Sequence, residues 1–240
     1  MREHAVPYRL GELRGLRYGP LPESLEAALP RWLAERRVAE GEEIHPGRVW
    51  HWEELAIKLH PPRGELREWF RRSPAVRAAE LHARLSVRTP RPLVAVQERR
   101  GLALGWSLFA SEFVEGTFLP RTWDSDPAGR EAFPRFLAAM HAAGVFHGDL
   151  HVRNMLWNGR EWVLLDLESL RHPLRALRRR RIIEDQWARL VCSLGPREGV
   201  QASFEAYLRE VGAKWEPQEA WRRVEQRARA LAPEWAPRAG

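Results

Sequence analysis

The fold of this chain is decided by residues 147–166, which read His147-Gly148-Asp149-Leu150-His151-Val152-Arg153-Asn154-Met155-Leu156-Trp157-Asn158-Gly159-Arg160-Glu161-Trp162-Val163-Leu164-Leu165-Asp166. The Asn158-Gly159 pair separates two apolar runs, which is the strongest short-range signal for a hairpin with a two-residue turn. In that register Asn154 pairs with Val163, and Asp166 lies roughly opposite His151. We therefore expect the hairpin to carry Asn154 and Asp166 to one edge, beside the loop that holds Asp149.

The spacing of these polar residues matches what phosphoryl transfer requires. Transfer from ATP needs an Asp that accepts the proton of the attacking hydroxyl, and oxygen ligands for the Mg²⁺ that bridges the phosphates. Kinase catalytic loops place a metal-binding Asn five residues after that Asp, and a second metal-binding Asp follows a short hairpin. Here Asn154 lies five residues after Asp149, and Asp166 lies twelve further on. We predict Asp149 as the base and Asn154 and Asp166 as Mg²⁺ ligands, with Asn154 also part of the ATP site.

Two details qualify this interpretation. His151 is a second catalytic candidate because its ring can hydrogen-bond a phosphate or a carboxylate, although an ordinary polar loop residue explains it almost as well. The metal-binding tripeptide is Asp166-Leu167-Glu168 instead of Asp-Phe-Gly, which favours kinases that act on small molecules or sugars. The alternative is that these residues have no catalytic role. They would then form a polar loop that joins a helix to a buried hairpin, with Asp149 capping a backbone amide.

Composition and charge narrow the class of protein. With 240 residues the chain can bury one large core or two small lobes. The single cysteine, Cys192, excludes a disulfide framework and is expected to be a core thiol. We expect no signal peptide, because Met1 is followed by no apolar run, and no stretch has the length of a membrane span. The net charge is +7 and the pI is about 10.5, and nearly all of the basic residues are Arg.

The scarcity of lysine draws attention to Lys58, one of only two in the chain. It belongs to Ala56-Ile57-Lys58, at the end of a predicted pair of strands at 49–52 and 55–59 joined by a turn. This resembles the kinase strand whose Lys holds the α- and β-phosphates. Where any cation would serve, this chain uses Arg, so we predict that Lys58 contacts ATP.

A helix after Ser73-Pro74 supplies the expected partner of Lys58. Ser is a good N-cap and Pro suits the first turn. Glu80 lies in the middle of this helix, and a kinase fold requires a helix-borne Glu that pairs with the strand Lys. We assign Glu80 to the ATP site; the alternative is a solvated helix residue.

In the rest of the N-terminal half, the strands and loops match the order expected of a kinase less clearly. The apolar residues of segment 1–30 show no clear helical or strand spacing, so we expect irregular chain or a short edge strand. The polar segment 41–48 is expected to be a loop that covers phosphates. Strands are expected at 93–96 and 102–110. They lead into Glu112-Phe113-Val114-Glu115-Gly116, where the Glu112 C=O and the Val114 N–H are placed to bind adenine.

The C-terminal half reads as helical. Phe133, Phe136, Leu137 and Met140 recur at helical spacing, and further helices are expected at 182–194, 200–211 and 217–231. Asp185 is expected to brace the catalytic loop. Before these helices, residues 171–181 carry six arginines and no acid: Arg171, Arg175, Arg178, Arg179, Arg180 and Arg181. They suit an anionic acceptor, and a plain solvated surface explains them equally well.

The pattern as a whole resembles the lipopolysaccharide kinase (Kdo/WaaP) family of bacterial protein-kinase-like enzymes. The residues that carry the resemblance lie between about 50 and 210, and they include Ala56-Ile57-Lys58, Ser73-Pro74, Thr89-Pro90-Arg91-Pro92-Leu93, Ser111–Gly116, His141–Leu150 and Val163–Glu168. The resemblance implies an α+β, two-lobed protein-kinase-like fold with a small, mostly β N-terminal lobe (1–111), a hinge (112–116) and a helical C-terminal lobe (117–240). It also implies ATP- and Mg²⁺-dependent phosphorylation of a heptose or Kdo hydroxyl in the lipopolysaccharide inner core.

Other functions remain open from sequence. The catalytic motifs suit aminoglycoside and choline-type phosphotransferases equally well, and a nucleotide-binding pseudokinase scaffold is a further alternative. Nucleic-acid binding ranks last, because the 12 tryptophans are scattered instead of clustering near the arginines. We expect a cytoplasmic enzyme whose partner is an anionic, lipid-linked sugar, with peripheral contact at the inner membrane left open. The sequence does not indicate an oligomeric state.

Overall fold

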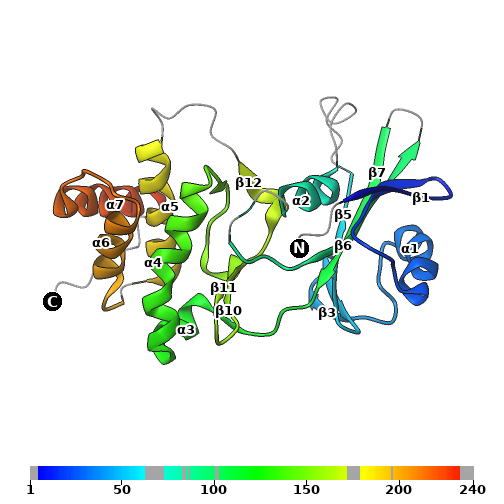
Figure 1. The fold of residues 1–240 in the computed structure, drawn as a ribbon, viewed down its shortest axis with the longest axis horizontal. Helices are drawn as coiled ribbons and strands as arrows, with labels where there is room; N and C mark the ends of the chain where they lie inside the picture. The colour runs from blue at the N-terminus through cyan, green and yellow to red at the C-terminus, as the bar shows by residue number, and fades with distance from the viewer. Residues whose placement is uncertain are drawn as a thin grey trace. The chain divides into compact units, whose positions relative to one another are not determined.

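A seven-stranded antiparallel sheet organises the first part of the computed structural model, which describes residues 5–62, 73–82, 85, 87–100, 103–171, 179–195 and 197–232 (Figure 1). The chain divides into two units, one formed by residues 1–84 and 90–114 and the other by residues 85–89 and 115–240. The sheet belongs to the first unit, and most of the helices belong to the second. The predicted α+β fold class is confirmed.

The strands of the sheet do not follow one another in chain order. Their spatial order is β1 (Val6–Leu10), β2 (Leu13–Arg17), β6 (Pro92–Arg100), β7 (Ala103–Glu112), β5 (Leu55–His60), β4 (Val49–Trp52) and β3 (Glu42–His45). The predicted strands at 49–52, 55–59, 93–96 and 102–110 are all present, and the last two are longer than predicted. β5, which carries Lys58, lies between β4 and β7.

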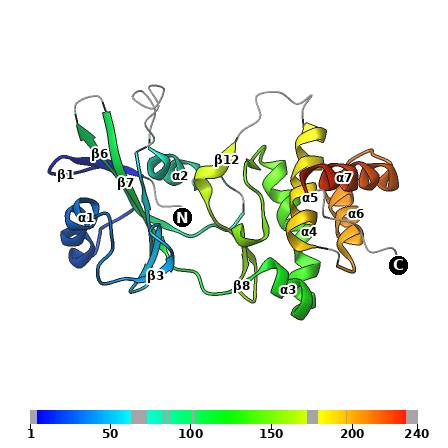
Figure 2. The ribbon, with the colours of Figure 1, turned by 180° about the vertical axis from the view of Figure 1, so that it is seen from behind.

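Two helices cover opposite faces of this sheet (Figures 1 and 2). α1 (Glu23–Glu35) buries Leu29 and Trp32 against Val94, Val96 and other apolar side chains of the central strands. α2 (Pro74–His82) packs on the other face, where the N–H of Ser73 donates to Oε1 of Gln97 at 3.1 Å. Because side chains alternate along a strand, Gln97 faces away from the side of Val94 and Val96. The core of the unit therefore lies on the α1 side.

The N-terminal stretch is more regular than its sequence suggests. For residues 1–30 the sequence predicts irregular chain or a short edge strand. β1 is indeed the edge strand, but it forms a hairpin with β2 and is followed by α1. Only Tyr8 of β1 is buried, so this strand carries almost no apolar alternation to detect. The expected loop at 41–48 is also partly wrong: Glu42–His45 form β3, whose four side chains are all exposed at the opposite edge.

The second unit is built on helices and short strands. Its helices are α3 (Leu119–Ser125), α4 (Pro127–Ala142), α5 (Arg179–Leu194), α6 (Val200–Glu210) and α7 (Pro217–Leu231). Its strands are β8 (Thr117–Phe118), β9 (Phe146–His147), β10 (Met155–Trp157), β11 (Trp162–Leu164) and β12 (Leu170–Arg171), and its short 3₁₀ turns are η2 (Val152–Asn154) and η3 (Leu167–Ser169). The predicted C-terminal helices are confirmed, with α5 beginning at Arg179.

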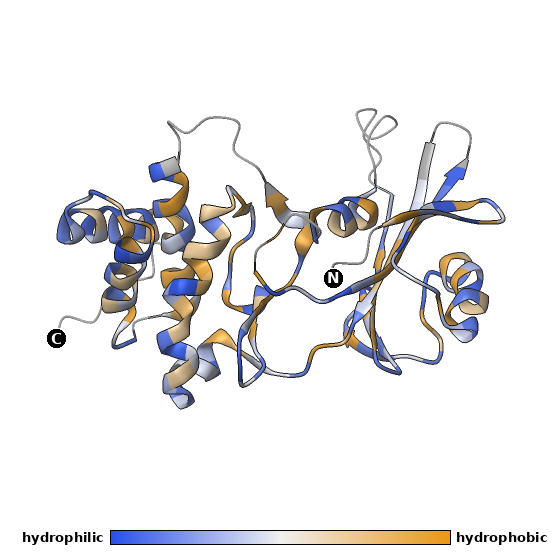
Figure 3. Cartoon of the chain, in the orientation of Figure 1, coloured by the Kyte–Doolittle hydropathy of each residue, from blue (hydrophilic) through white to orange (hydrophobic). Residues whose placement is uncertain are grey.

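An aromatic core holds these elements together. Phe133 of α4 lies edge-on to Trp162 of β11, at 5.3 Å between ring centroids, and edge-on to Trp187 of α5, at 6.1 Å. Trp187 in turn contacts Phe204 of α6 at 5.2 Å. Edge-to-face pairs of this kind stabilise a core beyond the area that they bury. Figure 3 shows α4 with apolar stretches along its length, whereas α7 is mostly hydrophilic.

The start of α4 is fixed to the hairpin. Asp126 caps the helix by accepting the N–H of Gly129 at 3.0 Å, and this bond lowers the pKa of its carboxyl. The second oxygen of Asp126 accepts the indole N–H of Trp157 at 2.7 Å. The cap therefore ties α4 directly to β10. None of the helices in the described part of the chain is long and apolar enough to cross a membrane.

Candidate active site

The β10–β11 hairpin has a longer loop than its Asn-Gly pair predicts. Trp157 pairs with Trp162 and Met155 with Leu164, which corrects the predicted register by two residues. The cause is the side chain of Asn158, whose Oδ1 accepts the N–H groups of Arg160 at 3.0 Å and Glu161 at 2.8 Å. Asparagine readily forms such local bonds, and here they make a four-residue loop.

The corrected register brings the two predicted metal ligands closer along the hairpin. Asn154 lies opposite Leu165 instead of Val163, because the Leu165 N–H donates to the Asn154 C=O at 2.9 Å. Asp166 is the next residue in the chain. A shift of two residues keeps every side chain on its predicted face of the hairpin, since faces alternate with period two.

Asn154 connects both predicted catalytic segments. It is 8% exposed, and its side-chain Nδ2 donates to the Asp149 C=O at 2.8 Å. Its backbone carbonyl binds the segment that contains Asp166. Because Nδ2 is used in this way, Oδ1 is the atom of Asn154 that suits a cation.

Asp166 is held in an unusual backbone conformation. Its φ is 57° and its ψ is 51°, which places it in the left-handed region that non-glycine residues seldom adopt. Ser169 secures it twice: Oγ donates to Oδ2 of Asp166 at 2.7 Å, and the Ser169 N–H donates to the Asp166 C=O at 3.1 Å. Such conformations cluster at functional sites, where the surroundings compensate their cost.

His147 joins the Asp149 loop to the Asp166 segment from inside the unit. Its Nδ1 accepts the Asp149 N–H at 3.3 Å, and its Nε2 donates to the Leu165 C=O at 3.2 Å. The neutral ring therefore carries its proton on Nε2. Burial lowers the pKa of His147, which favours this neutral form.

Asp149 and His151 lie at the surface of this arrangement. The Asp149 side chain is 61% exposed, and its Oδ2 is 3.7 Å from Nε2 of His151. Nδ1 of His151 accepts the Arg153 N–H at 3.2 Å, which fixes the ring at the start of η2. Asp149 therefore has the solvent access that a base acting on a bound hydroxyl requires.

The two residues of the first unit assigned to the ATP site, Lys58 and its expected partner Glu80, share one side of its sheet. Ile57 and Leu59 face the α1 core, so Lys58 between them projects from the opposite face, which α2 covers. Glu80 lies on α2 and is half-buried, as Lys58 is. The predicted N-cap of this helix is present, with Oγ of Ser73 accepting the Val76 N–H at 3.3 Å.

The segment predicted to bind adenine begins where β7 ends. The Phe113 N–H donates to the Glu54 C=O at 2.9 Å, and the Phe113 ring stacks on His51 at 3.8 Å. The carboxylate of Glu112 accepts the Arg91 N–H at 3.0 Å. In the second unit, a Cβ on Gly116 would lie 2.4 Å from the Trp157 carbonyl oxygen, so glycine is needed there for space.

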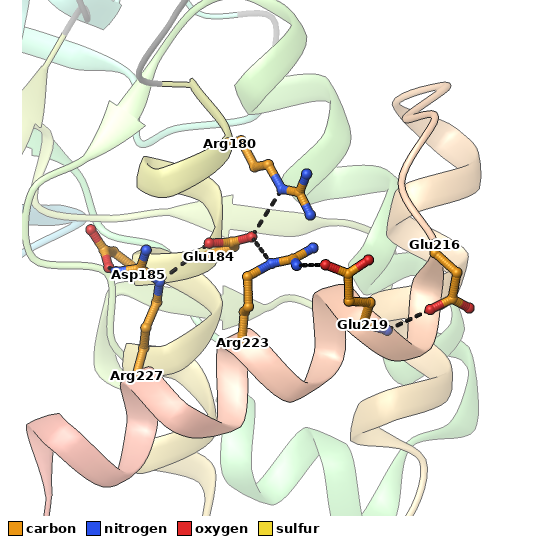
Figure 4. Close-up of polar contacts among 7 residues, drawn as sticks. All are labelled: Arg180, Glu184, Asp185, Glu216, Glu219, Arg223 and Arg227. Carbon is orange, nitrogen blue, oxygen red and sulfur yellow. Dashed lines mark hydrogen bonds and ion pairs between the residues drawn. The ribbon is translucent and has the colours of Figure 1, made fainter.

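The structure describes the predicted acceptor-binding arginines only in part. Arg175 and Arg178 lie outside the described residues, and for Arg171 in β12 and Arg179 in α5 only the backbone is described. Arg181 is exposed. Arg180 is engaged inside its unit, because its Nε donates to Glu184 at 3.1 Å (Figure 4). Its guanidinium also lies 5.0 Å from the ring centroid of Trp215.

Asp185 does not brace the catalytic loop. Its carboxylate binds Arg227 of α7 at 2.7 Å instead (Figure 4). The bracing contact comes from the next residue, because Nε2 of Gln186 donates to the His147 C=O at 2.8 Å. One residue is about 100° around a helix, so the two side chains leave different faces. Sequence reasoning also missed His147 and Ser169, although Ser169 lies only three residues after Asp166, a spacing at which a serine can reach back to it.

The oxygen atoms at Asn154 and Asp166 fit Mg²⁺. This ion is usually held by one or two carboxylates together with substrate phosphates, and it prefers oxygen ligands. Across the described ranges, no three His, Cys, Asp or Glu side chains cluster in a way that would hold a metal by themselves. A metal shared between these two side chains and a nucleotide is the arrangement that this donor set allows.

Comparisons with known proteins complete the description of the site. The model of the lipopolysaccharide kinase (Kdo/WaaP) family matches residues 75–210, which is more than half of the chain. The solved structure titled WaaP in complex with acyl carrier protein is 18% identical in sequence to this chain. The match covers 96% of this chain and 90% of the chain in that structure, with a TM-score of 0.48. A glucosamine kinase structure is 13% identical in sequence. The match covers 96% of this chain and 80% of the glucosamine kinase chain, with a TM-score of 0.40. A comparison with curated proteins finds no match.

Proposed function

We propose an acceptor and a mechanism for this chain on one premise: it belongs to the lipopolysaccharide kinase (Kdo/WaaP) family, and it is therefore a kinase. In this proposal the enzyme transfers the γ-phosphoryl group of ATP to a heptose or Kdo hydroxyl of the lipopolysaccharide inner core. The observation that carries the mechanism is the position of Asn154. Its side chain holds the Asp149 carbonyl, and its own carbonyl holds the residue before Asp166.

Asp149 acts as the base in the proposed reaction. It accepts the proton of the sugar hydroxyl as the oxygen attacks the γ-phosphorus, and ADP leaves with the electrons of the broken P–O bond. The exposure of its side chain supports this role, as does the anchoring of its backbone at both N–H and C=O. His151, whose Nε2 lies 3.7 Å from the Asp149 carboxylate, hydrogen-bonds the acceptor or a phosphate in this proposal.

Asn154 and Asp166 hold Mg²⁺ in this proposal, and the ion, when bound, neutralises charge on the phosphates. Lys58 contacts the α- and β-phosphates and is oriented by Glu80 of α2. The Glu112 C=O and the Val114 N–H bind adenine. The hairpin tip between β3 and β4 covers the phosphates.

The acceptor is proposed to be anionic and lipid-linked. The run from Arg171 to Arg181 follows the Asp166 segment directly in the chain, and the net charge of +7 favours an anionic partner. A lipid-linked acceptor would bring the enzyme to the inner face of the inner membrane as a peripheral protein. Because Arg180 is paired with Glu184, the acceptor role falls chiefly on the other arginines of the run.

The experiment that tests the acceptor measures phosphate transfer from labelled ATP to several candidates. Wild-type enzyme is offered lipopolysaccharide inner core that carries heptose and Kdo, and separately an aminoglycoside and choline. We expect transfer to the inner core only. Transfer to the aminoglycoside or choline, with none to the inner core, would overturn the proposed acceptor.

A charge-matched pair of variants tests the arginine run. Replacing Arg178, Arg179 and Arg181 with Gln should raise KM for the inner core while kcat for ATP hydrolysis without acceptor stays unchanged. The control replaces the exposed Arg209, Arg222 and Arg229 of α6 and α7 with Gln and removes the same charge. The difference should shrink as salt rises, because exposed charges more than about 10 Å apart are screened at 0.1 M ionic strength. Equal KM values in both variants would place the acceptor elsewhere.

A further inference from the structure

A chain of buried hydrogen bonds runs through the helical unit to the catalytic loop. The Tyr207 hydroxyl lies 2.7 Å from Nδ1 of His141, and Nε2 of His141 lies 2.6 Å from Oε1 of Gln186. Nε2 of Gln186 then donates to the His147 C=O at 2.8 Å. The chain thus passes from α6 through α4 and α5 to β9. All four residues are at most 4% exposed.

The polarity of this chain follows from its last acceptor. A backbone carbonyl can only accept, so Gln186 must present its NH₂ group to His147 and its Oε1 to His141. His141 must then donate from Nε2, and in the neutral ring Nδ1 accepts the Tyr207 O–H. Every donor points toward the catalytic loop. Hydrogen bonds aligned in one direction polarise one another, and buried networks of this kind specify one arrangement of the core.

The chain ends at the residue that positions Asp149. The carbonyl of His147 is held by Gln186, and the ring of the same residue accepts the Asp149 N–H and donates to the Leu165 C=O. A shift of the His147 backbone would therefore move both the loop with Asp149 and the segment that leads to Asp166. Gln186 thus reaches the base through His147.

We propose that Gln186 is a positioning residue for the catalytic loop, and that Tyr207 and His141 fix the orientation of its amide. This inference rests on the proposed function, in which Asp149 is the base. Gln186 acts by holding His147 in place, and the aligned chain prevents the amide from turning its oxygen toward the His147 carbonyl. A misplacement of about 1 Å can reduce turnover by as much as a hundredfold, so a buried bond two residues from the base can control the rate.

The test is Gln186→Met, which keeps the length of the side chain but removes both the N–H donor to His147 and the oxygen that accepts from His141. We expect kcat for inner-core phosphorylation to fall on the order of tenfold, while KM for ATP stays within about twofold. Amide hydrogen exchange at Asp149 should become faster. Tyr207→Phe, which removes only the distal hydroxyl, should reduce kcat less and in the same direction. The matched control is Gln201→Met on the exposed side of α6, where the amide donates to Glu205.

The outcomes separate this inference from the proposed function. If wild-type enzyme phosphorylates the inner core and Gln186→Met leaves both kcat and exchange at Asp149 unchanged, Gln186 has no positioning role. If wild-type enzyme does not phosphorylate the inner core, the proposed acceptor is wrong, and exchange at Asp149 still decides whether Gln186 positions the loop. Should Gln186→Met fail to fold, Tyr207→Phe decides the inference by the same two measurements.

Discussion

The side-chain N–H of Asn154 donates to the backbone carbonyl of Asp149 at 2.8 Å. One residue thus combines two proposed tasks, because its amide nitrogen holds the loop of Asp149, the proposed base, while its amide oxygen is the atom that suits Mg²⁺. The two tasks can be separated by mutation, since aspartate keeps an oxygen and loses the donor.

Asn154→Asp should keep the Mg²⁺ requirement and lose turnover. The carboxylate still offers an oxygen ligand, so the Mg²⁺ concentration for half-maximal activity should change by less than about threefold. Loss of the bond to Asp149 should lower kcat on the order of tenfold. Asn154→Ala removes the oxygen as well and should raise the Mg²⁺ requirement markedly. Activity measured against Mg²⁺ concentration checks both variants, and identical Mg²⁺ curves for Asn154→Ala and wild type would contradict the metal role.

Lys58→Arg should clearly lower the activity of the enzyme although it preserves the charge. The guanidinium is a planar fork, whereas the phosphates and Glu80 are proposed to need a compact ammonium. We expect kcat/KM for ATP to fall at least about tenfold. Lys214→Arg is the matched control, because it changes the only other lysine of the chain. If the Lys58→Arg variant has the same kcat/KM as wild type, the site does not require the compact ammonium group of lysine at this position.

Glu184 should be essential for stability and not for chemistry. Its side chain is 3% exposed and accepts bonds from Arg180 at 3.1 Å, Arg223 at 2.8 Å and Arg227 at 3.2 Å (Figure 4). Two of these arginines belong to α7, so Glu184 fastens α7 to α5. Removing Glu184 takes away three charge-assisted hydrogen bonds, but Arg223 and Arg227 keep Glu219 and Asp185 as partners, so the loss should cost about 2–3 kcal/mol.

Urea denaturation of Glu184→Ala and of Glu219→Ala measures this effect. Glu219 also binds Arg223, but its side chain is 60% exposed, so its loss should cost less than about 1 kcal/mol. Equal losses of unfolding free energy in the two variants would contradict the role assigned to Glu184.

The fold class could be predicted, and the candidate catalytic residues could be proposed from their spacing, because both depend on short-range patterns. Strands with one buried face, amphipathic helices and the Asp149–Asn154 interval are visible in the sequence. The sequence leaves β1 open between irregular chain and an edge strand and misreads β3 as a loop, because edge strands with exposed side chains show no alternation. The hairpin register was missed because the Asn158 side chain competes with the tight turn that an Asn-Gly pair favours.

The contacts behind the site could not be predicted, because they join residues far apart in the chain. Gln186 reaches His147 across 39 positions, and His141 reaches Tyr207 across 66. The choice between Asp185 and Gln186 depends on the rotation of α5, which the period of its apolar residues fixes only to within about one residue. The kinase-like fold, inferred from the motifs, agrees with the family to which the chain belongs.

Tyr18 should make the protein less stable at high pH. Its hydroxyl donates to the Ala79 C=O at 2.5 Å, beside Glu80, and burial raises its pKa from 10.0 to about 12. The unfolded chain loses this proton above about pH 10, whereas the folded protein retains it up to about pH 12. Folding stability contributed by the neutral hydroxyl is therefore complete below about pH 10 and decreases as the pH rises toward 12.

Phenolate absorbance of wild type and Tyr18→Phe isolates this group by difference. The difference titration should have its midpoint near pH 12, and the unfolding free energy of Tyr18→Phe should fall less steeply above about pH 10. The variant should also lose about 1 kcal/mol at neutral pH, the usual value of one hydrogen bond. A midpoint at the ordinary value of about 10 would show that the Tyr18 hydroxyl is open to solvent.

The most direct test of the account is the turnover of Asp149→Asn. Asparagine keeps the size of the side chain and the backbone bonds to His147 and Asn154, and it cannot accept the hydroxyl proton. We predict that kcat for inner-core phosphorylation falls by on the order of 10²–10⁴, while the affinity for ATP with Mg²⁺ changes by less than about twofold. A kcat within a few fold of wild type would contradict the assignment of Asp149 as the base.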